Sequence, residues 1–143
     1  MTISTSEGMA IGADGGEAKV DMLIDDVEID NFHAVVFIGG PGCLKYLDNN
    51  SSYRLIKEAV FAGKVLASIC ISPVVLAKAG VLEGKKATVW SSPLDESGIK
   101  TLEDYGALYY NQPVVVDGKI ITANGPASAK EFAQMIIRVL TSQ

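Results

Sequence analysis

The sequence is poor in histidine and cysteine, and it contains no long apolar run. Its one histidine, His33, and its two cysteines, Cys43 and Cys70, show neither the spacing of a zinc site nor a disulfide framework. No apolar stretch approaches the roughly 20 residues that a membrane-spanning helix needs. The first residues lack the basic and apolar regions of a signal peptide. These absences argue against metal, membrane and disulfide-rich secreted classes, and they favour a reducing, cytoplasmic location.

Clusters of positive charge are absent as well. The chain has 12 Lys and Arg residues against 17 Asp and Glu residues, which gives a net charge of −5. This balance argues against nucleic acid or an anionic membrane as the main partner. With 143 residues, 48% of them hydrophobic, the chain is long enough for one domain with a real core and too short for two.

A glycine-rich turn follows the first strongly apolar segment. Residues 34–38 form a continuous apolar run, and residues 39–42 read Gly-Gly-Pro-Gly. The pattern predicts a buried strand of a parallel sheet. Ligands of open α/β sheets bind at the carboxyl ends of such strands, and free glycine amides can hold an oxyanion. A plain tight turn is the alternative interpretation.

Cys70 stands where a second apolar strand, residues 65–69, passes directly into a helix. Ser72 is suited to cap that helix and Pro73 to its first position. A cysteine in such a sharp turn has the geometry of a nucleophile elbow, with its sulfur at the positive end of the helix dipole. The alternative is a small buried core residue.

The remaining pattern predicts alternating strands and helices. A helix over residues 50–62 between the two apolar strands makes them parallel neighbours, and a clear apolar stripe predicts a last helix after Pro126. Residues 7–16 are predicted as a loop. The helix over 50–62 is expected to begin with Asn50 and Ser51 as caps and to carry Tyr53, Ile56, Ala59 and Val60 on one face. Further strands are expected over residues 2–6, 86–90, 107–111, 114–116 and 120–122.

Several spaced segments together resemble the ThiJ/PfpI superfamily, which includes the parkinsonism-associated deglycase and the PfpI intracellular peptidases. The resemblance runs from about residue 20 to the C-terminus. The matching segments are residues 34–40, 67–70, 76–85 with 87–88, 117–123 and 125–126.

The resemblance implies a single flavodoxin-like α/β domain over residues 1–143, with a three-layer sandwich like that of class I glutamine amidotransferases. It makes Cys70 the catalytic nucleophile and puts the amides of Gly40 and Ile71 at an oxyanion hole. Gly39, Trp90 and Asn124 are expected near the pocket, although simple packing explains Trp90 equally well. A homodimer or larger homo-oligomer is also implied.

Three departures from the family pattern limit this assignment. Many members carry a histidine after the nucleophile, where this chain has Ile71, so a Cys-His peptidase lacks its base. The family's first strand and helix, with a glutamate that contacts the cysteine, have no counterpart, because residues 2–6 match its second strand. We therefore expect the domain to be N-terminally incomplete, with Met1 not the natural start or with the missing segment as a separate piece. Without that segment, the strand over residues 2–6 must pair differently or the sheet is left with a gap. Finally, Cys43 follows the glycine turn and is a candidate resolving thiol for Cys70, or a bystander.

The resemblance implies a cysteine-dependent lyase or hydrolase of the glyoxalase or deglycase type, connected with stress response. Its substrates would be small carbonyls or the adducts that they form on proteins. The missing histidine and glutamate leave a second class open, in which Cys70 is the oxidisable thiol of a non-catalytic redox sensor or chaperone. No metal or organic cofactor is implied.

Overall fold

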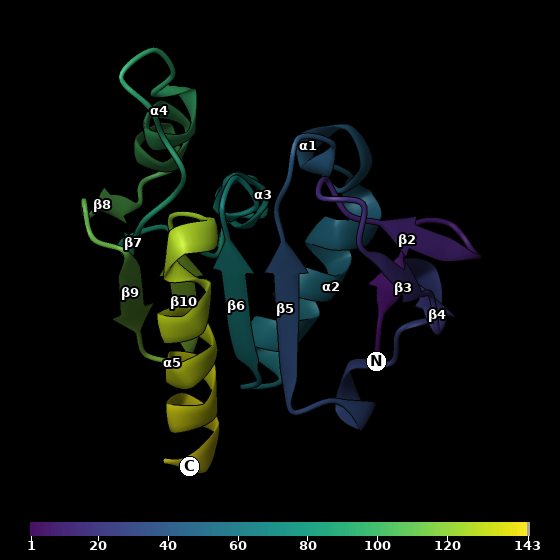
Figure 1. Ribbon diagram of the computed structural model, residues 1–143. Helices are drawn as coiled ribbons and strands as arrows, with labels where there is room; N and C mark the ends of the chain where they lie inside the picture. The colour runs from purple at the N-terminus through teal and green to yellow at the C-terminus, as the bar shows by residue number, and fades with distance from the viewer. Residues whose placement is uncertain (143) are drawn as a thin grey trace.

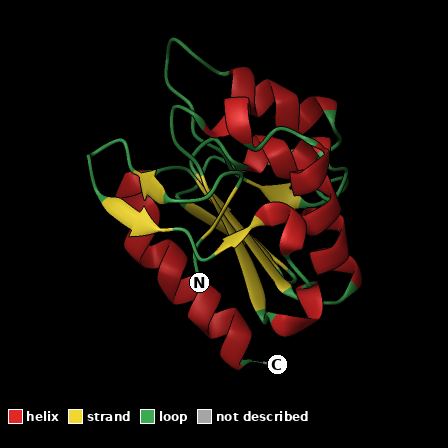
Figure 2. Ribbon diagram, turned by 90° about the vertical axis from the view of Figure 1, so that its right-hand side faces the viewer, coloured by secondary structure: helices red, strands yellow, loops and turns green. Residues whose placement is uncertain are grey.

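A central four-stranded sheet lies between two layers of helices in the computed structural model, which describes residues 1–142 (Figure 1, Figure 2). Its strands follow the order β5 (Ala34–Ile38), β6 (Val65–Ile69), β10 (Ile120–Ala123) and β9 (Val114–Asp117). The first three are parallel, and β9 pairs antiparallel with β10. The predicted flavodoxin-like α/β sandwich and the parallel pairing of the two apolar strands are confirmed.

Helix α2 (Asn50–Phe61) connects β5 to β6, and its boundaries agree with the prediction to within one residue. Its cap differs, because the side chain of Asn49, rather than Asn50 or Ser51, accepts a hydrogen bond from the Ser52 N–H at 3.0 Å. Val60, one of the four residues expected on the shared face, is 41% exposed. Leu55, which is 2% exposed, belongs to the buried face of the helix instead.

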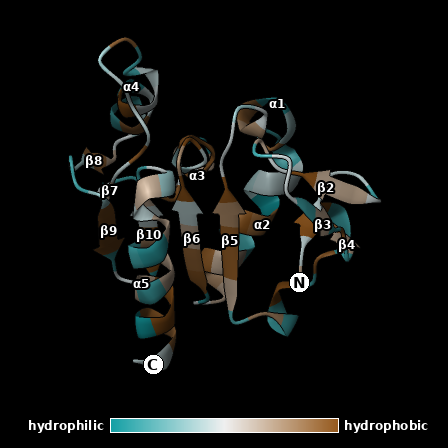
Figure 3. Cartoon of the chain, in the orientation of Figure 1, coloured by the Kyte–Doolittle hydropathy of each residue, from teal (hydrophilic) through white to brown (hydrophobic). Residues whose placement is uncertain are grey.

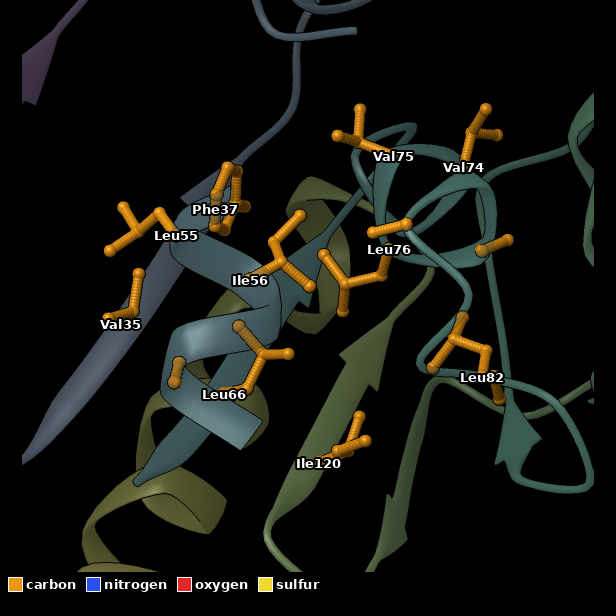
Figure 4. Close-up of a cluster of buried hydrophobic side chains, with 14 of the residues drawn as sticks. Val35, Phe37, Leu55, Ile56, Leu66, Val74, Val75, Leu76, Leu82 and Ile120 are labelled. Carbon is orange, nitrogen blue, oxygen red and sulfur yellow. The ribbon is translucent and has the colours of Figure 1, made fainter. Parts of the chain in front are cut away.

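The sheet has a hydrophobic core on each face. On one face, α2 and α3 (Pro73–Lys78) pack against β5, β6 and β10, so that Phe37, Leu55, Ile56, Leu66 and Leu76 form one cluster (Figure 4). On the other face, the apolar side of α5 (Ala129–Thr141) covers β6 and β10, as the hydropathy colouring shows (Figure 3). Helix α5 is the amphipathic last helix that the sequence predicts.

The N-terminal strands stand apart from the central sheet. Strand β1 (Ile3–Ser4) pairs parallel with β4 (Met22–Leu23) and not with β5. A hollow of about 140 Å³ lies between β1 and β5. Strand β1 is therefore not part of the central sheet. The predicted loop over residues 7–16 is wrong in part, because β2 (Met9–Ile11) and β3 (Glu17–Lys19) form an antiparallel hairpin.

The remaining elements are short. The strands predicted over 86–90 and 107–111 shrink to two residues each, since the Thr88 N–H donates to the Thr122 side chain instead of continuing a ladder. None of the helices in the described part of the chain has the length and hydropathy to span a membrane. The short helices and strands that complete the chain are α1 (Cys43–Tyr46), β7 (Lys86–Ala87), α4 (Ser97–Asp104), β8 (Leu108–Tyr109), η1 (Ile24–Asp26), η2 (Ile29–Asn31) and η3 (Pro126–Ser128).

Candidate active site

Cys70 has a strained backbone conformation at the carboxyl end of β6. Its φ is +67°, and it is the one described residue other than glycine with a positive φ. The Cys70 N–H donates to the Ala123 carbonyl at 2.9 Å, and its carbonyl accepts from the Trp90 N–H at 2.8 Å. Such strain persists only where the surroundings fix it, and it is typical of functional turns. The sharp strand-to-helix turn predicted at Cys70 is present.

Ser72 supports this turn in a way that the sequence did not predict. It precedes α3, but its side chain makes no capping hydrogen bond. The buried hydroxyl instead lies 2.9 Å from the Phe37 carbonyl and 2.8 Å from the Ile69 carbonyl, and it accepts from the Ile69 N–H at 3.2 Å. Ser72 thus joins the carboxyl ends of β5 and β6. Pro73 is the first residue of α3, as predicted.

Gly39 brings the glycine turn into contact with the cysteine turn. Its N–H donates to the Ile69 carbonyl at 3.1 Å. A Cβ atom at this position would lie 2.6 Å from the Ile69 oxygen, 2.8 Å from the Ile71 nitrogen and 3.0 Å from the Cys70 Cβ. Only glycine allows this approach. At Gly40, by contrast, an added Cβ would meet no atom within 4 Å.

A cavity of about 580 Å³ opens beside these turns. Its volume is within the range of small-molecule sites. Half-buried Cys70 lines it together with Gly39 and Gly40, while the other walls are apolar. Among the described residues that line this cavity, only Cys70 has a titratable side chain. Most of the apolar wall comes from β5 and α5, through Val36, Ile38, Ala129, Phe132, Ala133 and Ile136.

Cys43 lies buried at the start of α1, and both cysteines are free thiols. Burial raises the pKa of the Cys43 thiol to about 11, and the nearby charge of Cys70 raises it as well. A hydrogen bond from the Gly40 backbone lowers this pKa in part. The two thiols are therefore electrostatic neighbours. A resolving role for Cys43 stays a prediction.

The other residues considered in the sequence for a role at the site lie outside the wall of this cavity. Trp90 and Asn124 do not line the cavity; the Asn124 side chain accepts a hydrogen bond from the Ser128 hydroxyl at 2.7 Å, and the Trp90 ring lies beside Gly125. The Ile71 side chain packs into the core on the α2 side. His33 is exposed and precedes β5, at the end of the sheet opposite to Cys70.

The apolar walls of the cavity could not be predicted from the sequence. Val36 and Ile38 alternate with buried residues along an apolar strand, which predicted burial on both faces. Whether these two side chains are exposed depends on which segments pack over β5, and the residue pattern of the strand itself contains no information about that packing. Among residues 1–142, no group of three or more His, Cys, Asp or Glu residues is arranged to hold a metal ion.

Comparison with known proteins relates the whole described fold to one family. The model of the DJ-1/PfpI family matches residues 1–139. A ThiJ/PfpI domain protein from Brachyspira murdochii has a crystal structure with 36% sequence identity and a TM-score of 0.90, and the match covers 99% of this chain and 79% of that one.

Relatives are known by sequence as well. An uncharacterized Methanocaldococcus jannaschii protein is 42% identical over 96% of this chain and 66% of its own length. The Pyrococcus furiosus deglycase PfpI is 28% identical, over 96% of this chain and 80% of its own. A glutathione-independent glyoxalase of Caenorhabditis elegans is 30% identical, over 90% and 66%. The chain thus spans just under two thirds of two of these relatives, and it belongs to the DJ-1/PfpI family.

Proposed function

We propose that the chain acts on small reactive carbonyls, or on the adducts that they form on proteins, through the nucleophilic sulfur of Cys70. The observation that carries the proposal is the strained Cys70 turn, which presents a half-buried thiol to a cavity of small-molecule size. Relatives named deglycase and glyoxalase support the choice of substrate class.

In this proposal the Cys70 thiolate attacks the carbonyl carbon, and a carbon–sulfur bond forms while the carbonyl oxygen becomes an oxyanion. The backbone N–H of Ile71 stabilises this oxygen, because no described residue accepts a hydrogen bond from it. The Gly40 N–H is the second donor. Without substrate this N–H hydrogen-bonds to the Cys43 thiol, and in the proposal it reorients toward the oxyanion of the substrate.

Proton transfer needs a group that the described cavity does not supply, since Cys70 is its one titratable side chain. We assign this role to a carboxylate from outside residues 1–142. The same observation favours a second candidate, a redox sensor in which peroxide oxidises the Cys70 thiolate to sulfenic acid and is itself reduced to water. Homo-oligomerisation stays a prediction.

Methylglyoxal consumption separates the two functions. We expect turnover by the wild-type chain, loss of turnover in Cys70→Ser, and retained turnover in Cys43→Ser, the matched control at the other thiol. Turnover that survives Cys70→Ser would remove this sulfur from the mechanism. A chain without turnover whose Cys70 forms sulfenic acid in mild peroxide, as read by mass spectrometry, would favour the sensor.

A further inference from the structure

Two free thiols lie on either side of one peptide group at the cavity. An added Cβ at Gly39 would lie 3.0 Å from the Cys70 Cβ, so the Gly39 backbone touches the Cys70 side chain. The next amide, the N–H of Gly40, hydrogen-bonds to the Cys43 thiol, and the Cys43 N–H donates to the Gly40 carbonyl at 2.9 Å. The peptide group that joins the two glycines therefore separates the two cysteine side chains.

The two thiols differ in their access to solvent. Cys70 is half-buried and lines the cavity, whereas Cys43 is 6% exposed and does not line it. Burial raises the pKa of the Cys43 thiol to about 11, so this thiol is protonated at neutral pH. Peroxide reacts with accessible thiolates. Cys70 is therefore the thiol that an oxidant reaches first, and Cys43 remains reduced beside it.

Helix α1 depends on Cys43 for its place in the fold. It has four residues, and Cys43 is the buried one, while the other three are exposed. Figure 1 shows this helix beyond the carboxyl end of β5. The turn before it contains Gly40 and Gly42, and at Gly40 an added Cβ would meet no atom within 4 Å. Because few side chains hold α1, a movement of this turn can bring the Cys43 sulfur to Cys70.

We propose that Cys43 is the resolving thiol of Cys70, and that the two residues form a reversible disulfide when peroxide is present. Peroxide oxidises the Cys70 thiol to sulfenic acid and is itself reduced to water. The Cys43 sulfur then attacks the Cys70 sulfur, so that a sulfur–sulfur bond forms and the sulfur–oxygen bond breaks. The hydroxyl leaves with the Cys43 proton as water. Two thiols and one peroxide thus give one disulfide and two waters.

Oxidation of Cys70 prepares Cys43 for this attack. The negative charge of the Cys70 thiolate raises the pKa of Cys43, and this repulsion is absent once Cys70 is a neutral sulfenic acid. The hydrogen bond from the Gly40 N–H acts in the other direction, because it lowers the pKa of Cys43 and favours its thiolate. The attacking thiol is thus more acidic in the oxidised protein than in the reduced one.

The inference rests on the proposed reactivity of Cys70 and adds a regulation of that site. In the disulfide, Cys70 has no free sulfur with which to attack a carbonyl, so turnover stops until a thiol reductant restores it. The same bond keeps Cys70 from the irreversible step to sulfinic acid. Cys43 therefore preserves the nucleophile under oxidising conditions that would otherwise destroy it.

Mass spectrometry of the unreduced protein tests the disulfide. After treatment with equimolar hydrogen peroxide and alkylation of the remaining thiols, we expect the peptides of Cys43 and Cys70 to be joined within a single chain. In Cys43→Ser, dimedone should instead trap Cys70 as sulfenic acid. Leu44→Ser, a change at an exposed neighbour in α1, is the matched control and should form the disulfide as the wild type does.

Recovery of the Cys70 thiol is the second readout. After excess peroxide and then dithiothreitol, iodoacetamide should again label Cys70 in the wild type and in Leu44→Ser, and this recovery should be lost in Cys43→Ser. A wild-type Cys70 that is oxidised without bonding to Cys43, or whose disulfide joins two chains, overturns the resolving role alone. A Cys70 that reacts with neither peroxide nor iodoacetamide overturns the resolving role and the proposed function together.

Discussion

Substitution of Gly39 by alanine tests the contact between the glycine turn and the cysteine turn. The added Cβ would lie 2.6 Å from the Ile69 oxygen and 2.8 Å from the Ile71 nitrogen, distances that real Cβ contacts essentially never show. Both opposing atoms belong to the backbone, so a side-chain rotation cannot relieve the clash. The carboxyl ends of β5 and β6 must separate, and the Cys70 turn must shift with them.

The cost depends on the size of this shift. Overpacking by one methyl group in a rigid region costs about 1–3 kcal/mol, and we expect the upper half of that range because no neighbour is flexible. For a chain of 143 residues, the average entropy of unfolding converts about 2–3 kcal/mol into a drop in melting temperature of about 7–10 °C. Thermal and urea unfolding followed by circular dichroism measure both quantities.

Gly40→Ala is the matched control. The same methyl group is added one residue later, where no atom lies within 4 Å, and Gly40 is not among the glycines with positive φ. Both substitutions change the entropy of the unfolded chain equally, so the difference between them isolates the native-state clash. If the two variants unfold within about 0.5 kcal/mol of each other, the argument from close approach at Gly39 is wrong.

Three further predictions concern single side chains. Ser72→Ala should destabilise the chain by about 1–3 kcal/mol in urea unfolding, because it removes the buried hydrogen bonds of this hydroxyl to the Phe37 carbonyl and the Ile69 backbone and leaves the buried Ser68 hydroxyl without its partner; a loss below about 0.5 kcal/mol would contradict this. In the native chain at pH 8, iodoacetamide should label Cys70 alone, because Cys43 is buried with a pKa of about 11; rapid native labelling of Cys43, read by peptide mass spectrometry, would oppose this. Burial by itself raises the pKa of Asp48, but hydrogen bonds, including the one from Lys78 at 2.5 Å, hold it below its usual value. The stability that Asp48 contributes is therefore present above about pH 4 and is lost as the pH falls through the lower native pKa. The difference in free energy of unfolding between the wild-type chain and Asp48→Asn should shrink over that pH range. A difference that does not change with pH would refute the assignment.

Much of the fold could be predicted because its signals are local. Five consecutive apolar residues in β5 and a mostly apolar run of five in β6, each followed by a special turn, predicted parallel neighbours with functional carboxyl ends. The apolar stripe of α5 predicted a helix packed on the sheet. Details that depend on non-local partners were missed, such as the β2–β3 hairpin in a glycine-rich segment and the replacement of Val60 by Leu55.

The sequence by itself determined the family resemblance, the glycine-rich turn after β5 and the strand-to-helix turn at Cys70, because these signals lie in residues that are neighbours along the chain. Tertiary structure decided the rest. Only packing between distant strands shows that Gly39 touches Cys70, that Ser72 joins two strands, and that Trp90 and Asn124 lie outside the cavity. Only the assembled sheet shows that, among residues 1–142, one edge of β5 has no partner strand, since a free backbone hydrogen-bonding group is a property of its surroundings and not of its residue.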